Sequence, residues 1–220
     1  MLSDRPQTKE QLQAIIKKKV KETVNTHKRG GETLDLSYID TSAITDMSGL
    51  FKGMFPKNKF YIRRIDFTGW DTSNVTDMKE MFLNCKELWW LDLSMFDTRK
   101  VTDMSKMFYN CEKLWELDVS SFDTSNVETM KKMFMKCAML RVDVSHFKLK
   151  RDVNLEYMFA GEDMNAGVKI FKNDKIKFPS GKEYLTTYEY DHMFKGWNVD
   201  NLPNNPEAEW IHKFFMTIIT

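Results

Sequence analysis

The sequence is poor in several kinds of residue, and each shortage argues against a class of protein. Five prolines and nine glycines in 220 residues, with no low-complexity tract, argue against a collagen-like or disordered chain. Charges of the two signs nearly cancel, because 33 lysines and arginines accompany 32 aspartates and glutamates. The formal net charge of +1 gives no overall field that would attract nucleic acid or an anionic membrane.

Long apolar runs are missing too. No stretch approaches the roughly 18 consecutive apolar residues of a transmembrane helix, so the sequence predicts no membrane span. The opening MLSDRPQTKEQ lacks the apolar core of a secretory signal peptide. On this ground alone we expect a cytoplasmic protein.

Patterns that carry catalysis or bind metal are also absent. The three cysteines lie 26 residues apart and form no short ligand motif, which favours buried small side chains: Cys85, Cys111 and Cys137. The four histidines are scattered, and none forms a nucleophile motif with a serine, cysteine or carboxylate. We therefore expect no enzyme, no metal and no cofactor.

What the sequence does have is an internal repeat. LDLSMFDTRKVTDMSKMFYNC begins at Leu91, and LDVSSFDTSNVETMKKMFMKC begins 26 residues later at Leu117. A third close copy begins at Ile65, and looser copies begin at Leu34 and Val142. A sixth, degraded copy extends to residue 197.

The hydrophobic period changes within each copy. Leu91 and Leu93 alternate with Asp92, as in a short strand, whereas apolar residues from Val101 to Cys111 recur every three or four positions, as on a helix. One such unit cannot bury its apolar side alone, so units must stack. The repeat predicts an α/β solenoid of five to six strand-turn-helix units, with its methionines in the core.

Helical caps are expected at both ends. Residues 1–33 contain an amphipathic helix that a capping box from Thr8 to Gln11 can begin, and residues 34–197 form the repeat array. Residues 198–220 contain the apolar stripe of EWIHKFFMTIIT. This stripe either covers the last unit, leaving a monomer as we expect, or pairs two copies through their C-terminal helices.

The motif LxxLDLSxFDTSNVTDMSxMFxxC, present from Leu88 to Cys111 and from Leu114 to Cys137, resembles the BspA-like leucine-rich repeat family of bacterial surface proteins. The resemblance covers roughly residues 34–160. It implies a right-handed leucine-rich-repeat-type solenoid that binds host proteins, matrix or other cells, with no catalytic residues. It also implies a cell-surface or secreted location, the alternative to the cytoplasm.

Two sets of residues on the strand side are candidates for binding. An aspartate stands in the middle of each short strand motif, at positions that include Asp66, Asp92 and Asp118. Local hydroxyl and amide hydrogen bonds could explain these carboxylates, or they could form an acidic strip for a basic partner. Beside them the sequence places large aromatic and basic residues: Trp89, Trp90, Trp115, Arg63 and Arg141.

Exposed tryptophans beside charges are typical of binding hot spots, although they could instead fold back over neighbouring strands. A second aspartate series, including Asp71 and Asp97, is expected to bond its own turn. We predict a non-enzymatic protein-binding scaffold that uses the concave face. The alternatives are a carbohydrate-binding module and a self-assembling structural repeat protein.

Overall fold

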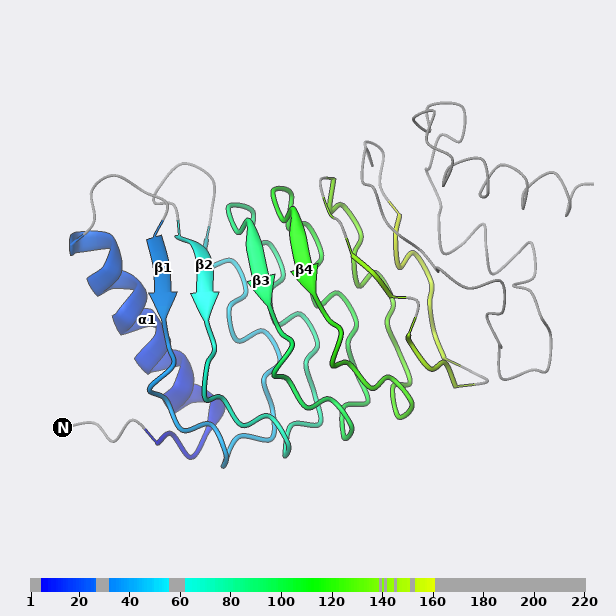
Figure 1. The fold of residues 1–220 in the computed structure, drawn as a ribbon, viewed down its shortest axis with the longest axis horizontal. Helices are drawn as coiled ribbons and strands as arrows, with labels where there is room; N and C mark the ends of the chain where they lie inside the picture. The colour runs from blue at the N-terminus through cyan, green and yellow to red at the C-terminus, as the bar shows by residue number, and fades with distance from the viewer. Residues whose placement is uncertain are drawn as a thin grey trace, which may run out of the picture.

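In the computed structural model, repeated coils of chain lie side by side in a row, with one N-terminal helix at the end of the row (Figure 1). The structure describes residues 5–26, 32–55, 62–138, 140, 142–144, 146–150 and 153–160. Helix α1 spans Lys9–Thr26, and the strands are β1 (Glu32–Asp35), β2 (Ile62–Asp66), β3 (Trp90–Asp92) and β4 (Glu116–Asp118). The sixth copy and the expected C-terminal helix lie outside the described residues.

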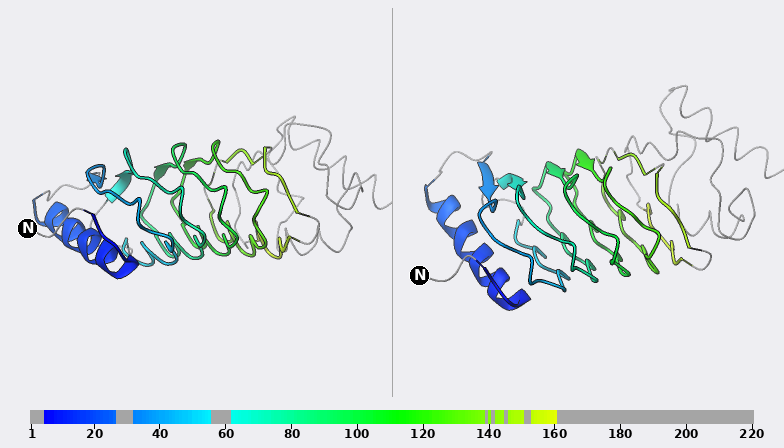
Figure 2. Two further views of the ribbon diagram at one scale, coloured as in Figure 1. Left: turned by 90° about the horizontal axis from the view of Figure 1, so that it is seen from below. Right: turned by 60° about the horizontal axis from the view of Figure 1, so that its bottom comes forward.

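The strands are parallel, and equivalent positions of neighbouring repeats face each other. Strand β1 pairs with β2, and β3 pairs with β4 with Leu91 opposite Leu117. The backbone N–H of Trp89 donates to the carbonyl of Arg63 at 3.1 Å, which links β3 to β2. The strands lie along one edge of the array (Figure 2). The expected side-by-side pairing is therefore observed for β1 with β2 and for β3 with β4, which form two separate two-stranded sheets.

A second row of parallel contacts joins the repeats at another position of each coil. Single bridges connect Asp46 to Asp77, Asp77 to Asp103, Asp103 to Thr129, and Thr129 to Asn154. Beyond each bridge, every second backbone N–H donates to the next repeat, as from Phe82 to the carbonyl of Met107 at 2.8 Å. Successive repeats are thus hydrogen-bonded on more than one side of the coil.

The segments predicted to be helices are successions of turns, so that part of the prediction was wrong. Between Met104 and Cys111, N–H groups alternate between a carbonyl three residues back and a carbonyl of the next repeat. Lys106 and Asn110 have left-handed φ values of 55° and 61°. An α-helix requires every N–H to bond four residues back with negative φ, so this alternation excludes it.

Stacked phenylalanines form the centre of the array. One phenylalanine per repeat is fully buried at the same position: Phe51, Phe82, Phe108, Phe134 and Phe159. The rings of Phe82 and Phe108 stack with centroids 5.5 Å apart and planes 4° apart, and Phe108 stacks on Phe134 at the same distance. The methionines expected in the core are buried beside them, including Met104 and Met107.

Buried threonines join each repeat to the backbone of the next. The Thr98 hydroxyl donates to the carbonyl of Asp123 at 3.1 Å and accepts from the N–H of Asp123 at 2.9 Å. The same pair of bonds is made by three other threonines: Thr41, Thr72 and Thr124. One hydroxyl thereby satisfies two partly buried backbone groups, whose loss of a partner would cost free energy.

Helix α1 lies against β1, at the first repeat (Figure 1). Its apolar residues Leu12 and Ile16 are fully buried, whereas Lys17, Lys18 and Lys21 are exposed. The Thr8 hydroxyl accepts from the N–H of Gln11 at 3.3 Å, as a capping box predicts. In a capping box the side chain of Gln11 would accept from the backbone N–H of Thr8. Here the side-chain Oε1 of Gln11 accepts instead from the backbone N–H of Gln7. Of the residues the structure describes, none forms a helix long and apolar enough to span a bilayer.

Candidate binding surface

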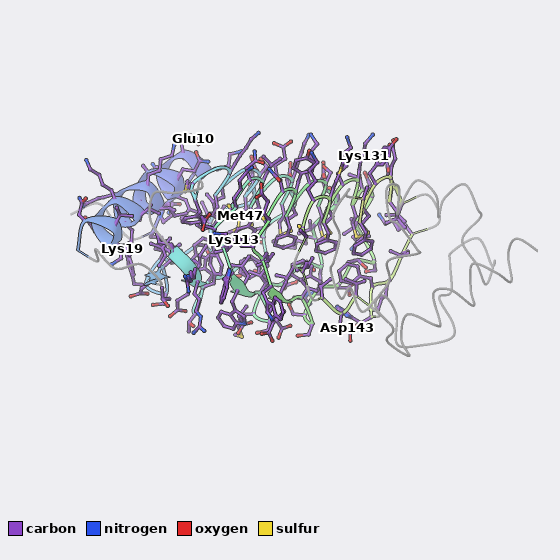
Figure 3. All side chains as sticks on the ribbon, turned by 90° about the horizontal axis from the view of Figure 1, so that it is seen from above. Glu10, Lys19, Met47, Lys113, Lys131 and Asp143 are labelled. Atoms are coloured by element: carbon purple, nitrogen blue, oxygen red, sulfur yellow. The ribbon has the colours of Figure 1, made fainter. Side chains whose placement is uncertain are left out.

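The candidate surface lies on the strand side of the array, where polar and aromatic side chains point outward between buried apolar ones. Figure 3 shows Asp143 and Lys131 extending from opposite sides of the array, with the strands on the side of Asp143. Along β2 the outward residues are Arg63, Arg64 and Asp66, and the inward residues Ile62 and Ile65 are buried.

We call Asp66, Asp92 and Asp118 the aspartate row. Each Oδ1 accepts the backbone N–H of the residue two positions later, at 2.9 Å from Thr68, 2.9 Å from Ser94 and 2.8 Å from Ser120. The Ser94 hydroxyl also donates to Asp92 at 2.6 Å. The local hydrogen bonding expected for these carboxylates is confirmed, so each one shapes the turn that follows its strand.

The equivalent carboxylate of the first repeat is Asp35. The hydroxyl and N–H of Ser37 both donate to Asp35 at 2.7 and 3.0 Å, and they hold the pKa of Asp35 below its ordinary value. Asp35 is also exposed to solvent. A residue of this series therefore both shapes its turn and presents a negative charge.

We call Arg63, Trp89 and Trp115 the tryptophan row. They occupy one position of three successive repeats, and backbone hydrogen bonds join them, including Trp115 N–H to the Trp89 carbonyl at 2.9 Å. Trp89 is 45% exposed and Trp115 is 40% exposed. The guanidinium of Arg63 lies over the Trp89 ring at 4.9 Å, a cation–π geometry.

Trp90 lies between the two rows and is only half-buried, with the Arg64 guanidinium 5.3 Å above its ring. Arg141, the remaining residue predicted for this surface, lies outside the described residues. The structure thus brings together the other predicted residues on three neighbouring strands.

Sequence reasoning missed one exposed apolar residue of this surface. Met95 is 70% exposed and follows the turn that Asp92 begins. Its repeat position holds Gly69 and Ser121 in the neighbouring copies, so it does not share the periodic methionine positions. That mismatch is the signal that separates Met95 from the core methionines.

The second aspartate series also bonds its own turns, as predicted. Asp71 accepts the N–H of Ser73 at 2.9 Å, and Asp97 accepts the N–H of Arg99 at 3.1 Å. The Arg99 guanidinium adds a salt bridge to Asp97. Hydrogen bonds from Ser73 hold the pKa of Asp71 below its ordinary value. These carboxylates therefore have a structural explanation.

The cysteines are structural as well. All three are free and fully buried, and the thiol of Cys111 donates to the carbonyl of Phe82 at 3.2 Å. Burial raises the pKa of Cys137 to about 12, which keeps its thiol protonated. Within the described ranges, no three His, Cys, Asp or Glu side chains gather as a metal ion would require.

Comparison with known proteins gives one match. A family model described as "Mycoplasma protein of unknown function, DUF285" matches residues 51–171, which is more than half of the chain. No curated protein and no solved structure matches the sequence.

Proposed function

The chain belongs to this DUF285 family, and since the family description names no activity, we propose from the exposed surface that the protein is a non-enzymatic scaffold that binds another protein through its strand side.

We also propose the fold type of the repeat array. The array is a right-handed leucine-rich-repeat-type solenoid of the BspA-like kind, in which turn segments stand where helices were expected. Its support is the repeated motif, together with the parallel pairing of Leu91 with Leu117 and the stacking of Phe108 on Phe134. Stacked repeats of this kind present an extended surface that suits binding of a macromolecule.

The observation that carries the binding proposal is the exposure of large apolar side chains in one place. Trp89 and Met95 of one repeat and Trp115 of the next are 40–70% exposed. Large aromatic side chains with flanking arginines dominate the free energy of binding at many protein interfaces. A partner that covered these side chains would remove apolar surface from water, which stabilises the complex.

A carbohydrate ligand is less well supported. A sugar ring stacks on an open aromatic face, and the Arg63 guanidinium already covers one face of Trp89. The half-buried Trp90 has Arg64 over its ring in the same way. Arginines that stack on tryptophans are common at protein interfaces, where both residue types are enriched.

The test is quantitative capture of proteins from the native cell by the purified chain and by the double variant W89A/W115A. We expect W89A/W115A to capture at least tenfold less of the specific partner than the unchanged protein does, since hot-spot truncation typically costs about 2 kcal/mol or more. Its melting temperature should stay close to that of the unchanged protein, because both side chains are substantially exposed.

Tyr109→Ala is the matched control, because Tyr109 is an aromatic residue of a turn segment rather than of a strand. It should leave capture unchanged. Equal capture by the unchanged protein and W89A/W115A would exclude this surface. A collapse of the melting temperature in W89A/W115A would show that the tryptophans serve the fold.

A further inference from the structure

Among the described residues of the strand side, carboxylates outnumber basic side chains. Its outward residues in the described repeats include two arginines and five carboxylates: Arg63, Arg64, Asp35, Asp66, Asp92, Glu116 and Asp118. Both guanidinium groups lie over tryptophan rings. Within the described part of the chain, the aspartate row makes no salt bridge.

Several carboxylates elsewhere on the array form salt bridges with lysines. Glu80 is held by Lys52 at 2.7 Å and by Lys106 at 3.1 Å, and the buried Glu87 is held by Lys113 at 2.6 Å. Each of these salt bridges joins neighbouring repeats, so lysines neutralise Glu80 and Glu87. The aspartate row is where uncompensated charge meets exposed tryptophan.

The spacing of the row distinguishes between partner conformations. Neighbouring strands lie about 4.8 Å apart, so the two intervals of the aspartate row span about 10 Å. An α-helix that lies perpendicular to the strands has a residue on the same side about every 5.4 Å, or about 11 Å over two turns. An extended strand returns one about every 6.7 Å, or about 13 Å over two intervals, which falls out of step with the carboxylates.

From these observations we propose that the partner docks as an amphipathic α-helix that lies across β2, β3 and β4, with a stripe of lysines or arginines over the aspartate row and an adjacent apolar stripe over the tryptophan row. This assignment rests on the proposed function and adds the chemistry and conformation of the partner.

Two segments of this chain, α1 and the closing EWIHKFFMTIIT, do not match such a helix. In α1 the apolar residues Leu12 and Ile16 are buried in the first repeat, so its exposed side is basic without an apolar stripe. The closing segment EWIHKFFMTIIT is apolar but contains one lysine, Lys213, and no arginine. Neither of these two segments meets both the charge and the apolar requirement of the partner helix.

The experiment measures binding of a fluorescent 18-residue peptide to the full chain by anisotropy. The probe carries lysine at every third or fourth position and leucine on the adjacent stripe, so that it forms an amphipathic helix. One control peptide has the same sequence with two central residues as D-enantiomers, which breaks the helix at equal charge and composition. A second control reorders the residues so that lysines fall on all sides.

We expect the probe to bind at least tenfold more tightly than either control peptide, and to weaken as salt rises from 50 to 500 mM, because screening reduces attraction between charges. The double variant D92N/D118N should weaken the probe at least fivefold. Asparagine can still accept the turn hydrogen bonds, so the fold is preserved. The matched variant D71N/D97N removes the same charge from the other aspartate series and should change the affinity less than twofold.

Equal affinity for the probe and its D-residue form would overturn the helical partner, and so would no binding at millimolar peptide. Equal weakening by D71N/D97N and D92N/D118N would overturn the role of the aspartate row. If W89A/W115A abolishes capture of native proteins while the probe does not bind, the binding surface stands and the helix assignment fails.

Discussion

At the scale of single residues, one type of side-chain hydrogen bond recurs at up to three turns of a repeat. An aspartate accepts the N–H two residues later at each turn: Asp92 from Ser94, Asp97 from Arg99 and Asp103 from Ser105. Asparagine and threonine do the same in later repeats, at Asn154 and Thr129. The abundance of aspartate in this chain is therefore explained chiefly by turn geometry.

Asp77 is the member of these series whose charge opposes folding. Burial and the neighbouring carboxylates Asp103 and Asp46 raise the pKa of Asp77. A raised pKa means that the ionised form is less stable in the folded than in the unfolded chain, so ionised Asp77 lowers stability at neutral pH. This penalty disappears as the pH falls below the unfolded value near 4.

Asp77→Asn should therefore stabilise the protein at pH 7 by about a few tenths of a kcal/mol, a small gain because solvent screens a half-exposed charge. Asparagine can keep the turn, as Asn154 does at the equivalent position. Urea unfolding at pH 7 and pH 3 measures the gain at each pH. An equal gain at both would contradict an electrostatic origin.

The buried threonines give a second prediction at this scale. Thr98→Val retains the shape of the side chain but leaves the N–H and carbonyl of Asp123 without the hydroxyl that serves both. We expect a loss of about 2–4 kcal/mol in the free energy of unfolding. Thr98→Ser keeps the hydroxyl and should cost less than half as much. Denaturant unfolding of both variants tests the order, which a purely steric role would reverse.

At the scale of elements, the sequence predicted the strands and the core but not the conformation of the segments between them. Alternation around Leu91 and Leu93 located β3, because a strand has period two. Between Val101 and Cys111, a spacing of three to four residues fits a helix and a succession of turns equally well. Backbone bonds to the next repeat decide between them, and they depend on a neighbour that one unit does not contain.

In three repeats, the turn segments place two residues with side chains in the left-handed region, and in the first repeat glycines occupy both positions. Lys136 has φ 63° at the position that Gly53 occupies in the first repeat, where φ is 66°. A side chain in this region costs about 1–2 kcal/mol, and glycine avoids that cost.

Lys136→Gly should therefore raise the free energy of unfolding by up to about 1 kcal/mol. Lys79→Gly is the control, since Lys79 is equally exposed without a left-handed backbone, and it should lose about 0.5–1 kcal/mol. Thermal unfolding of the two variants gives opposite shifts if the backbone argument is right. A loss of stability in both would refute it.

At the scale of the whole molecule, the 26-residue period predicted which residues lie side by side. It brought Trp89 next to Trp115 and Asp92 next to Asp118, so the two rows of the candidate surface follow from spacing alone. The pairing of Arg63 with Trp89 and the exposure of Met95 did not follow, because both depend on how side chains pack across repeats.

Deleting residues 91–116 removes one whole period and joins Trp90 to Leu117 in register. Because each repeat contacts mainly its neighbours, the shortened chain should fold cooperatively, with a compact profile in size-exclusion chromatography and a lower melting temperature. Deleting residues 91–103 removes half a period and misaligns the phenylalanine stack, and this variant should aggregate. Similar behaviour of the two deletions would contradict the repeat as the folding unit.

The hydrogen bonds between repeats also determine how the molecule responds to force. Those of Thr98, Phe82 and Trp115 all reach a neighbouring repeat, so they run along the length of the array. Tension between the two ends of the array pulls on the hydrogen bonds at every boundary between repeats. The weakest boundary can then separate while the other boundaries remain intact. Each repeat released adds about 26 × 3.5 Å, or roughly 90 Å, of extended chain. Under such tension we expect the array to lengthen in steps of one repeat.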